Sequence, residues 1–309
     1  MPKFQIDKIA QLTGHNASIF ALSPDKDPQH YLSGAGDGWI VRWDLSQPQD
    51  GRLVAKVDTQ VFSLLYLPEY DKAVVGDMNG GVHWVELQNP DDTKDIAHHK
   101  KGVFAIERVG PHVFTAGGQG LLTRWSAAES SSLESLRLSH QSLRCIAYAP
   151  ERRELAIGSS DNSIYLVDLD TLELKHKIED AHDNSVFSLH YSPDEQHLLS
   201  GSRDAHLKAW QLGASAPKLV SSQPAHWFTI NSIAYHPSGK WFATASRDKT
   251  IKIWDAANFK LVKVLETIRD GCHVNSVNRL LWHEYEDYLI SASDDRSMIV
   301  WSLAEEQAV

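Results

Sequence analysis

The sequence has only two cysteines, Cys145 and Cys272, and they do not form a CxxC pair. This scarcity excludes a scaffold held by several disulfides and a thiolate zinc site, and it favours a reducing compartment. The chain also lacks a run of about 18 apolar residues that could cross a membrane. The first dozen residues lack the apolar stretch of a signal peptide. We therefore expect a cytoplasmic protein that has no membrane partner.

An excess of positive charge is missing too, because 30 basic residues against 40 acidic residues give a formal net charge of −10. We therefore expect no nucleic acid partner, since binding to a phosphate backbone needs clustered Lys and Arg. Of the 309 residues, 42% are hydrophobic and 23% are charged, which is typical of a globular protein with a large core. Tryptophan is abundant, with 10 residues.

The tryptophans recur at a regular interval. Five of them, as in Arg42-Trp43-Asp44, follow a turn residue by six positions, and two weaker copies carry valine at the Trp position. The seven turn positions are Asp37, Asn79, Gln119, Asp161, Asp204, Asp248 and Asp295. They lie 40 to 47 residues apart and fill the chain, so the repeat predicts a single domain over residues 1–309.

Each copy contains four short β-rich segments. In copy five these are residues 185–193, 197–202, 206–212 and 218–223, bounded by Gly, Pro, Asp and Ser. No segment shows a helical period over a helical length. A four-stranded sheet cannot bury both of its faces alone, but sheets stacked radially cover one another.

A second periodic feature indicates the family. A His lies 22 residues before the turn Asp in four copies, and a Ser or Thr lies four residues before it. Gly14-His15 together with Trp43-Asp44 matches the GH…WD signature of propeller repeats. The sequence thus resembles the WD40-repeat family over essentially its whole length. The resemblance implies an all-β fold, a single seven-bladed β-propeller of four-stranded antiparallel blades. Copy seven ends after its Trp, so residues 4–12 should complete blade 7 and close the ring.

The resemblance further implies a buried, hydrogen-bonded tetrad in each complete blade. The four sets are His15–Ser33–Asp37–Trp43, His182–Ser200–Asp204–Trp210, His226–Thr244–Asp248–Trp254 and His273–Ser291–Asp295–Trp301. A buried carboxylate is costly unless it accepts hydrogen bonds. We therefore interpret these His and Asp residues as structural groups and assign no catalytic residue.

Copies two to four depart from this pattern. Copy two has Val75, Asn79 and Val85 at the hydroxyl, Asp and Trp positions. Copy three has Gln119, with either His98 or His99 available as its histidine. Copy four keeps His140 and Asp161 but lacks the hydroxyl and the Trp. These three blades are expected to depend more on apolar packing.

The family places binding positions on one face of the ring, around the central channel. Those that flank the start of each inner strand are Phe20, Phe62, Phe104, Arg144, Phe187, Asn231 and Asn278. The Phe residues either pack between blades or form an apolar ring at the channel mouth. Arg203 and Arg247 each lie directly before the turn Asp of their copy. They are either solvated charges or part of a basic region with Arg144. Such a face would suit a peptide with apolar anchors and acidic residues.

The last interval is the longest, and its extra residues include Arg269, Asp270 and Cys272. This loop either overhangs the binding face or is a tolerated insertion. No complete dinucleotide, phosphate-loop, zinc-protease, calcium-loop or hydrolase motif is present. We accordingly assign no metal site and no cofactor.

The sequence therefore favours a non-catalytic protein–protein interaction scaffold or adaptor whose partner is another protein or peptide, in a chain that we expect to be a monomer. The alternative is an enzyme or small-ligand-binding propeller that uses the central funnel. A subunit of a larger assembly would also fit the pattern.

Overall fold

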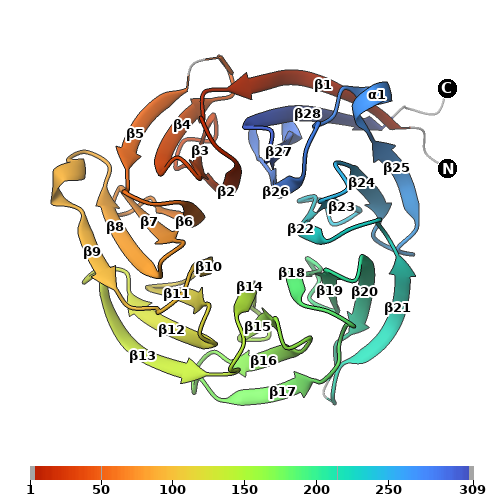
Figure 1. Cartoon of the computed structure of the whole chain (residues 1–309). Helices are drawn as coiled ribbons and strands as arrows, with labels where there is room; N and C mark the ends of the chain where they lie inside the picture. The colour runs from red at the N-terminus through yellow and green to blue at the C-terminus, as the bar shows by residue number, and fades with distance from the viewer. Residues whose placement is uncertain (1–3, 50, 214, 306–309) are drawn as a thin grey trace.

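The structure, a computed structural model, describes residues 4–49, 51–213 and 215–305. These residues form seven four-stranded antiparallel sheets arranged as blades around a central channel (Figure 1). This confirms the predicted all-β, seven-bladed propeller. We number the blades 1 to 7 in the order of their turn positions.

In each blade the strands follow one another from the channel outward. Blade 1 is β2 (Ile19–Pro24), β3 (His30–Ala35), β4 (Trp39–Asp44) and β5 (Arg52–Lys56). Blade 2 is β6 (Val61–Leu67), β7 (Lys72–Asp77), β8 (Gly81–Glu86) and β9 (Lys94–Ala97). Blade 3 is β10 (Val103–Val109), β11 (His112–Gly117), β12 (Leu121–Ser126) and β13 (Ser131–Arg137). Blade 4 is β14 (Leu143–Ala149), β15 (Glu154–Ser159), β16 (Ile164–Asp168) and β17 (Leu174–Ile178).

Blade 5 is β18 (Val186–Tyr191), β19 (His197–Ser202), β20 (His206–Gln211) and β21 (Lys218–Pro224). Blade 6 is β22 (Ile230–Tyr235), β23 (Trp241–Ser246), β24 (Ile251–Asp255) and β25 (Leu261–Leu265). Blade 7 is β26 (Val277–Trp282), β27 (Leu289–Ser293), β28 (Ser297–Glu305) and β1 (Phe4–Thr13). The helical pieces of the described chain are short: α1 (Thr267–Asp270) and the 3₁₀ turns η1 (Pro90–Asp92) and η2 (Tyr285–Asp287).

The core lies between the blades. Seven clusters of buried apolar side chains occur among the described residues, and each joins two neighbouring blades. The cluster between blades 7 and 1, for example, packs Trp43 and Tyr31 against Val300 and Met298. Both faces of a blade are therefore buried, which explains why the second strands are almost continuously apolar or small.

Each inner strand begins with a register shift. In β2 the pairing with β3 passes from Ile19 directly to Ala21, so Phe20 has no partner in the ladder. The same skip occurs at the second residue of every inner strand. A bulge of this kind turns the side chain of the extra residue away from the sheet. The fold thus directs one side chain per blade toward the same end of the channel.

The N-terminal strand closes the ring. β1 pairs antiparallel with β28, with Gln5 opposite Ala304 and Thr13 opposite Ser297 (Figure 1). This confirms the predicted closure, in which blade 7 takes its outer strand from the beginning of the chain. As a result, no blade of the described ring is left with three strands.

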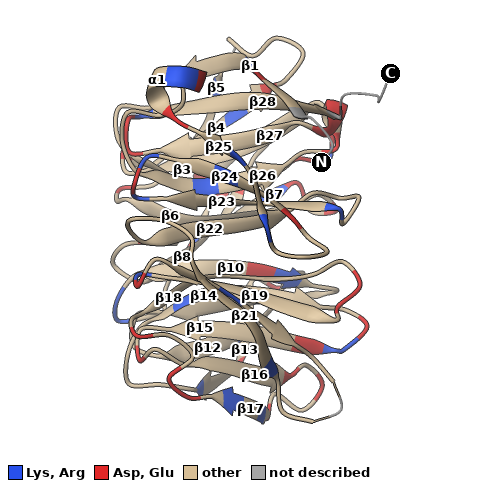
Figure 2. Cartoon of the chain, turned by 90° about the vertical axis from the view of Figure 1, so that its right-hand side faces the viewer, with Lys and Arg blue, Asp and Glu red and all other residues tan. Residues whose placement is uncertain are grey.

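Charged residues gather mainly in the connections between strands and on the outer edge, while the bodies of the blades are largely uncharged (Figure 2). Among the described helices, none has the length and apolar character needed to cross a bilayer.

Candidate binding face and central channel

In the four blades with a complete tetrad, the structure brings the four residues together in the same way. In blade 6, His226 Nδ1 lies 2.9 Å from the Asp248 carboxylate and its Nε2 lies 2.8 Å from Thr244 Oγ1. The indole N–H of Trp254 donates to the same hydroxyl at 2.9 Å. The corresponding contacts in blades 1, 5 and 7 measure between 2.7 and 3.1 Å.

The hydrogen-bond partners fix the protons of each tetrad. Because the indole can only donate, the hydroxyl accepts from it and donates to His Nε2, and His Nδ1–H donates to the carboxylate. Burial is the main cause that lowers the pKa of His226, so its ring is neutral at pH 7. Burial would raise the pKa of Asp248, but hydrogen bonds from His226 and Thr250 outweigh it, so the net effect is a lowered pKa. Both ring nitrogens are occupied, and none is left to act as a base.

Blade 3 replaces the carboxylate with an amide. His99, rather than His98, contacts Thr115 at 2.8 Å, and Trp125 donates to the same hydroxyl at 2.9 Å. Gln119 accepts the backbone N–H of Lys100 at 3.2 Å. Burial, with His98 nearby, lowers the pKa of His99 to about 4 because no carboxylate stabilises its charged form.

Blade 4 does not use His140, which is exposed. Ser139, one residue earlier, occupies the place of the histidine and donates to Asp161 at 2.6 Å. The hydroxyl of Tyr165 donates to the same carboxylate at 2.5 Å. The expectation that His140 serves this blade is therefore wrong, because the sequence gap there is 21 residues and the buried position lies 22 residues before Asp161.

Blade 2 uses a carboxylate that the repeat did not indicate. Asp77, two residues before Asn79, accepts the backbone N–H groups of Asn79, Gly80 and Gly81 at 2.7 to 2.8 Å. It also accepts from His83 Nε2 at 2.9 Å. Trp84, adjacent to the predicted Val85, is fully buried, and its indole N–H has no partner among the described residues. The signal that could have revealed Asp77 is an acidic residue at the end of an otherwise buried apolar strand.

All seven predicted positions at the inner-strand starts line one depression at the channel mouth, which we call the mouth. Its volume is about 210 Å³. Its lining residues are Phe20, Phe62, Phe104, Arg144, Phe187, Asn231, Asn278 and Arg279. The first seven of these are the bulged residues of the seven inner strands.

The aromatic residues of the mouth contact one another around the ring. The rings of Phe20 and Phe62 meet edge to face at 5.3 Å, and Phe62 stacks on Phe104 at 5.6 Å. The guanidinium of Arg144 lies between Phe104 and Phe187, 4.3 and 5.2 Å from the ring centroids. These side chains are half-buried. Of the two interpretations of the Phe positions, the geometry matches the ring at the mouth.

The two asparagines join blades 6, 7 and 1. Asn231 Nδ2 donates to the Val277 carbonyl at 2.9 Å, across the junction between blades 6 and 7. Asn278 Nδ2 donates to the Ile19 carbonyl of blade 1 at 3.1 Å and to Asp294 at 2.7 Å. The amide donors of the mouth are therefore already used within the protein.

Outside the mouth, the same face carries exposed basic and aromatic side chains. Arg203 and Arg247 are exposed, on blades 5 and 6. The loop that follows His226 presents Trp227, 87% exposed, and Phe228, 57% exposed. This loop is attached to the turn of Arg247, whose backbone N–H donates to the Thr229 carbonyl at 3.0 Å. The sequence analysis missed Trp227, although a Trp in a polar loop outside the repeat positions was the available signal.

The extra loop of the last interval lies at the outer rim. It contains α1, beside β1, and Lys8 of β1 donates to the Gly271 carbonyl at 2.7 Å (Figure 1). These contacts hold the loop against the outer strand, away from the central channel, and whether it overhangs the rim of the binding face stays a prediction. Cys272 is buried, and burial raises the pKa of its thiol to about 12, which makes it a poor nucleophile.

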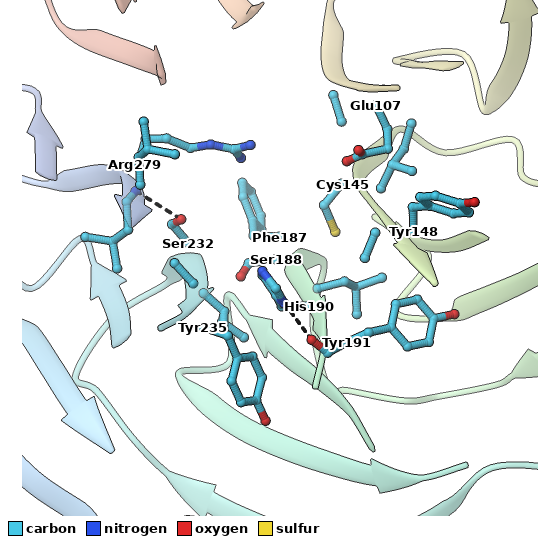
Figure 3. A pocket seen from close by; sticks show the side chains of 18 of the residues that line it. Glu107, Cys145, Tyr148, Phe187, Ser188, His190, Tyr191, Ser232, Tyr235 and Arg279 are labelled. Atoms are coloured by element: carbon cyan, nitrogen blue, oxygen red, sulfur yellow. Dashed lines mark hydrogen bonds between the residues drawn. The ribbon is translucent and has the colours of Figure 1, made fainter. Parts of the chain in front are cut away.

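Beneath the mouth, the channel contains a second cavity of about 360 Å³. Figure 3 shows Arg279 entering it from β26 and Glu107 from β10 on the opposite side. Burial raises the pKa of Glu107 to about 7, against the opposing effects of the Arg108 backbone N–H and the Arg279 charge. Burial also lowers the pKa of Arg279. The sequence analysis singled out neither residue.

No group of three or more His, Cys, Asp or Glu side chains within the described ranges is arranged to hold a metal ion. The cysteine that lines the channel, Cys145, is buried, and burial raises its pKa to about 12. His190 also lines the channel, and its Nδ1 contacts the Tyr191 carbonyl at 2.7 Å (Figure 3). Among the described residues that line the channel, Cys145 and His190 do not form a nucleophile paired with a base.

Seven four-stranded blades surround a channel, and side-chain hydrogen bonds stabilise the region of the turn in each blade. This arrangement defines a seven-bladed β-propeller. The family model described as "WD domain, G-beta repeat" matches residues 6–44, 131–168, 173–211, 217–255 and 260–302, which is more than half of the chain. The chain therefore belongs to the WD40-repeat family.

Individual relatives are distant. Protein tipD of Dictyostelium discoideum is 23% identical over 296 residues, which cover 94% of this chain and 48% of that protein. Actin-interacting protein 1-2 of Arabidopsis thaliana is 22% identical over 170 residues, covering 52% of this chain and 28% of its own length. The chain thus spans at most about half of these relatives. The crystal structure of the WD40 β-propeller domain of Doa1 superposes with a TM-score of 0.83 at 19% identity, covering 97% of both chains. This likeness shows the fold.

Proposed function

We propose that this chain is a non-catalytic protein–protein interaction scaffold that binds a protein or peptide at the mouth and on the face around it. The observation that carries the proposal is the convergence of seven bulged residues on one depression, surrounded by exposed Arg203, Arg247 and Trp227. Tryptophan and arginine are the residues that most often dominate the binding energy of protein interfaces. The occupied ring nitrogens of the tetrad histidines support the absence of catalysis.

The proposal includes a monomer in a reducing compartment such as the cytoplasm. Cys145 and Cys272 are both free and buried thiols, which suits that environment. The name of one relative mentions actin, and the geometry of this chain does not favour that partner over another.

The test is capture of partners from a lysate of the source cells by two variants of the purified chain. One combines Phe20→Ser, Phe62→Ser and Phe187→Ser. The other combines Arg203→Glu, Arg247→Glu and Trp227→Ser, which leaves the aromatic stack intact and guards against a folding defect. We expect both to lose partners that the unmodified chain retains, as measured by mass spectrometry.

A matched control places the same kinds of substitution away from this face. Leu133→Ser and Leu174→Ser change exposed apolar residues on the outer strands β13 and β17. The control variant should capture the same partners as the unmodified chain. Identical partner lists for all folded variants would show that the face is not the binding site.

The channel cavity favours one alternative, an enzyme or small-ligand binder that uses the funnel. Glu107 and Arg279 supply opposite charges on facing walls, as small polar ligands require (Figure 3). A thermal-shift screen of metals, nucleotides and metabolites distinguishes this alternative, because a ligand that binds only the folded state raises the melting temperature. A large shift from one compound class would replace the scaffold proposal.

A further inference from the structure

Arg279 breaks the pattern of the inner strands. It is the third residue of β26, the first to re-enter the ladder after the bulge. The six equivalent residues of the other blades are all small: Ala21, Ser63, Ala105, Cys145, Ser188 and Ser232. One guanidinium therefore occupies a layer of the channel that is otherwise lined by small side chains.

The position of Arg279 is directly beneath the aromatic residues of the mouth. It lines the mouth, the larger channel cavity below, and a small space between them that Phe20, Phe62 and Phe104 also line. Its guanidinium is open to the channel interior and makes no hydrogen bond or close ion pair with the described residues, although the Glu107 carboxyl across the cavity partly opposes the effect of burial on its pKa (Figure 3). An enclosed guanidinium without a partner retains five unused donors for a planar anion.

The other donors around the mouth are already engaged. The Asn231 and Asn278 amides donate to backbone carbonyls, and Arg144 Nε donates to Ser160 at 2.8 Å while its guanidinium stacks between two Phe rings. A polar ligand that enters the mouth therefore finds unused donors on Arg279 and on the terminal nitrogens of Arg144, and Arg279 is the deeper of the two because it also lines the cavity below. Arg144, together with exposed Arg203, adds positive charge to the entrance.

We propose that the mouth binds an acidic peptide segment by inserting one glutamate or aspartate side chain between the Phe rings, so that its carboxylate pairs with Arg279. This inference rests on the proposed function and specifies its partner. A glutamate side chain suits the site because its aliphatic stem can contact the Phe rings while its carboxylate reaches the layer below them. A basic anchor is disfavoured because it would meet Arg144 and Arg279.

The test selects binders from a random peptide library displayed on phage, with the full chain as bait. We expect the selected peptides to share an Asp or Glu flanked by apolar residues. Synthetic versions are then titrated against the unmodified chain and the variants Arg279→Gln, Arg279→Lys and, as a control, Arg52→Gln, which changes an exposed arginine on β5. Circular dichroism and the melting temperature verify that each variant is folded.

We expect Arg279→Gln to weaken binding by roughly 10- to 100-fold, the usual effect of losing a charged hydrogen-bonded pair. Arg279→Lys should weaken it less, and Arg52→Gln should leave it unchanged. Replacing the acidic residue of the peptide with its amide should cause a similar loss. The amide peptide should then bind the unmodified chain and Arg279→Gln equally, because the pair is already broken in both.

The remaining outcomes separate the two proposals. Selected peptides that bind Arg279→Gln as tightly as the unmodified chain, but bind a further variant, Phe104→Ser, more weakly, would overturn this inference and leave the scaffold proposal standing. The absence of any selected peptide would count against both. A rise in melting temperature with succinate that disappears in Arg279→Gln, in the absence of selected peptides, would assign Arg279 to a small free carboxylate and overturn the peptide proposal.

Discussion

Two arcs of the ring stabilise the same turn by different means. Blades 5, 6, 7 and 1 form a continuous arc in which a carboxylate, an imidazole, a hydroxyl and an indole repeat with nearly the same distances. Blades 2, 3 and 4 form the other arc, and each uses a different substitute. Blade 2 uses Asp77 with His83, blade 3 uses Gln119 for the Lys100 N–H and Thr115 for His99, and blade 4 uses Asp161 with Ser139 and Tyr165. What the blades share is a side-chain acceptor for backbone N–H groups in or beside the turn, and the tetrad is one way to supply it.

The largest expected effect concerns β1, the strand from the beginning of the chain that completes blade 7 in the arc of tetrad blades. Deletion of residues 1–12 removes most of β1, including buried Leu12, and exposes the edge of β28. We expect insoluble protein, or a melting temperature lower by roughly 10 °C or more, as a loss of about 5 kcal/mol would cause. The measurements are the soluble fraction and the thermal melt.

The point substitution Ile9→Ser, in the same strand, changes a side chain that is 47% exposed and serves as the control. It should melt close to the unmodified chain. A deletion variant with an unchanged melt would mean that the outer strand contributes little to closure.

The next effect compares the turn residues of the two arcs directly. Asp248→Ala should lower the free energy of unfolding by about 3 kcal/mol or more, because it leaves buried His226 and nearby backbone donors without an acceptor. Asn79→Ala should cost less than about 1 kcal/mol, since the Asn79 side chain is exposed. Denaturant unfolding gives both values. Equal destabilisation by the two substitutions would contradict the difference between the arcs.

A third substitution asks whether the substitute in blade 2 is as important as a tetrad. Asp77→Ala should cost about 2 kcal/mol, because three backbone N–H groups and His83 lose their acceptor. Asp77→Asn retains one acceptor oxygen and should cost about half as much. A value for Asp77→Ala as small as that for Asn79→Ala would show that blade 2 depends on apolar packing alone.

The smallest effect concerns the channel and depends on pH. Because burial raises the pKa of Glu107 to about 7 from a usual value of 4.5, the folded state binds a proton that the unfolded state has lost between these values. Stability from this group is therefore present below pH 4.5 and is lost as the pH rises through 7. Because channel water partly reaches Glu107, we expect the free energy of unfolding to change by roughly 1–3 kcal/mol over this pH range.

Glu107→Gln removes this titration, so the variant should gain stability relative to the unmodified chain between pH 5 and pH 8. Unfolding curves at several pH values measure the difference. Parallel pH profiles for the two proteins would indicate that Glu107 has the same pKa in the folded and unfolded states, which would contradict the effect of burial.

The parts of the structure that repeat could be predicted from the sequence. Seven blades, the closing strand and the mouth positions follow from the period, because equivalent residues occupy equivalent places in the ring. The substitutes Asp77 and Ser139 were missed because each takes over a role from a neighbouring register position, although an acidic end of an apolar strand and a hydroxyl 22 residues before Asp161 were signals in the sequence. Arg279 was missed for a different reason, since its significance appears only when the seven inner strands are aligned at their bulges.

The pairing of β1 with β28 also has a consequence for how the protein is made. Because β1 precedes the other six blades in the sequence and β28 follows them, the two strands can pair only after those blades have left the ribosome. Until then six blades can form from local hairpins, while the seventh waits for a contact that spans almost the whole chain. Long-range pairing of this kind slows folding, and the nascent chain carries an unpaired strand edge until β28 has been synthesised, which favours aggregation and the use of chaperones.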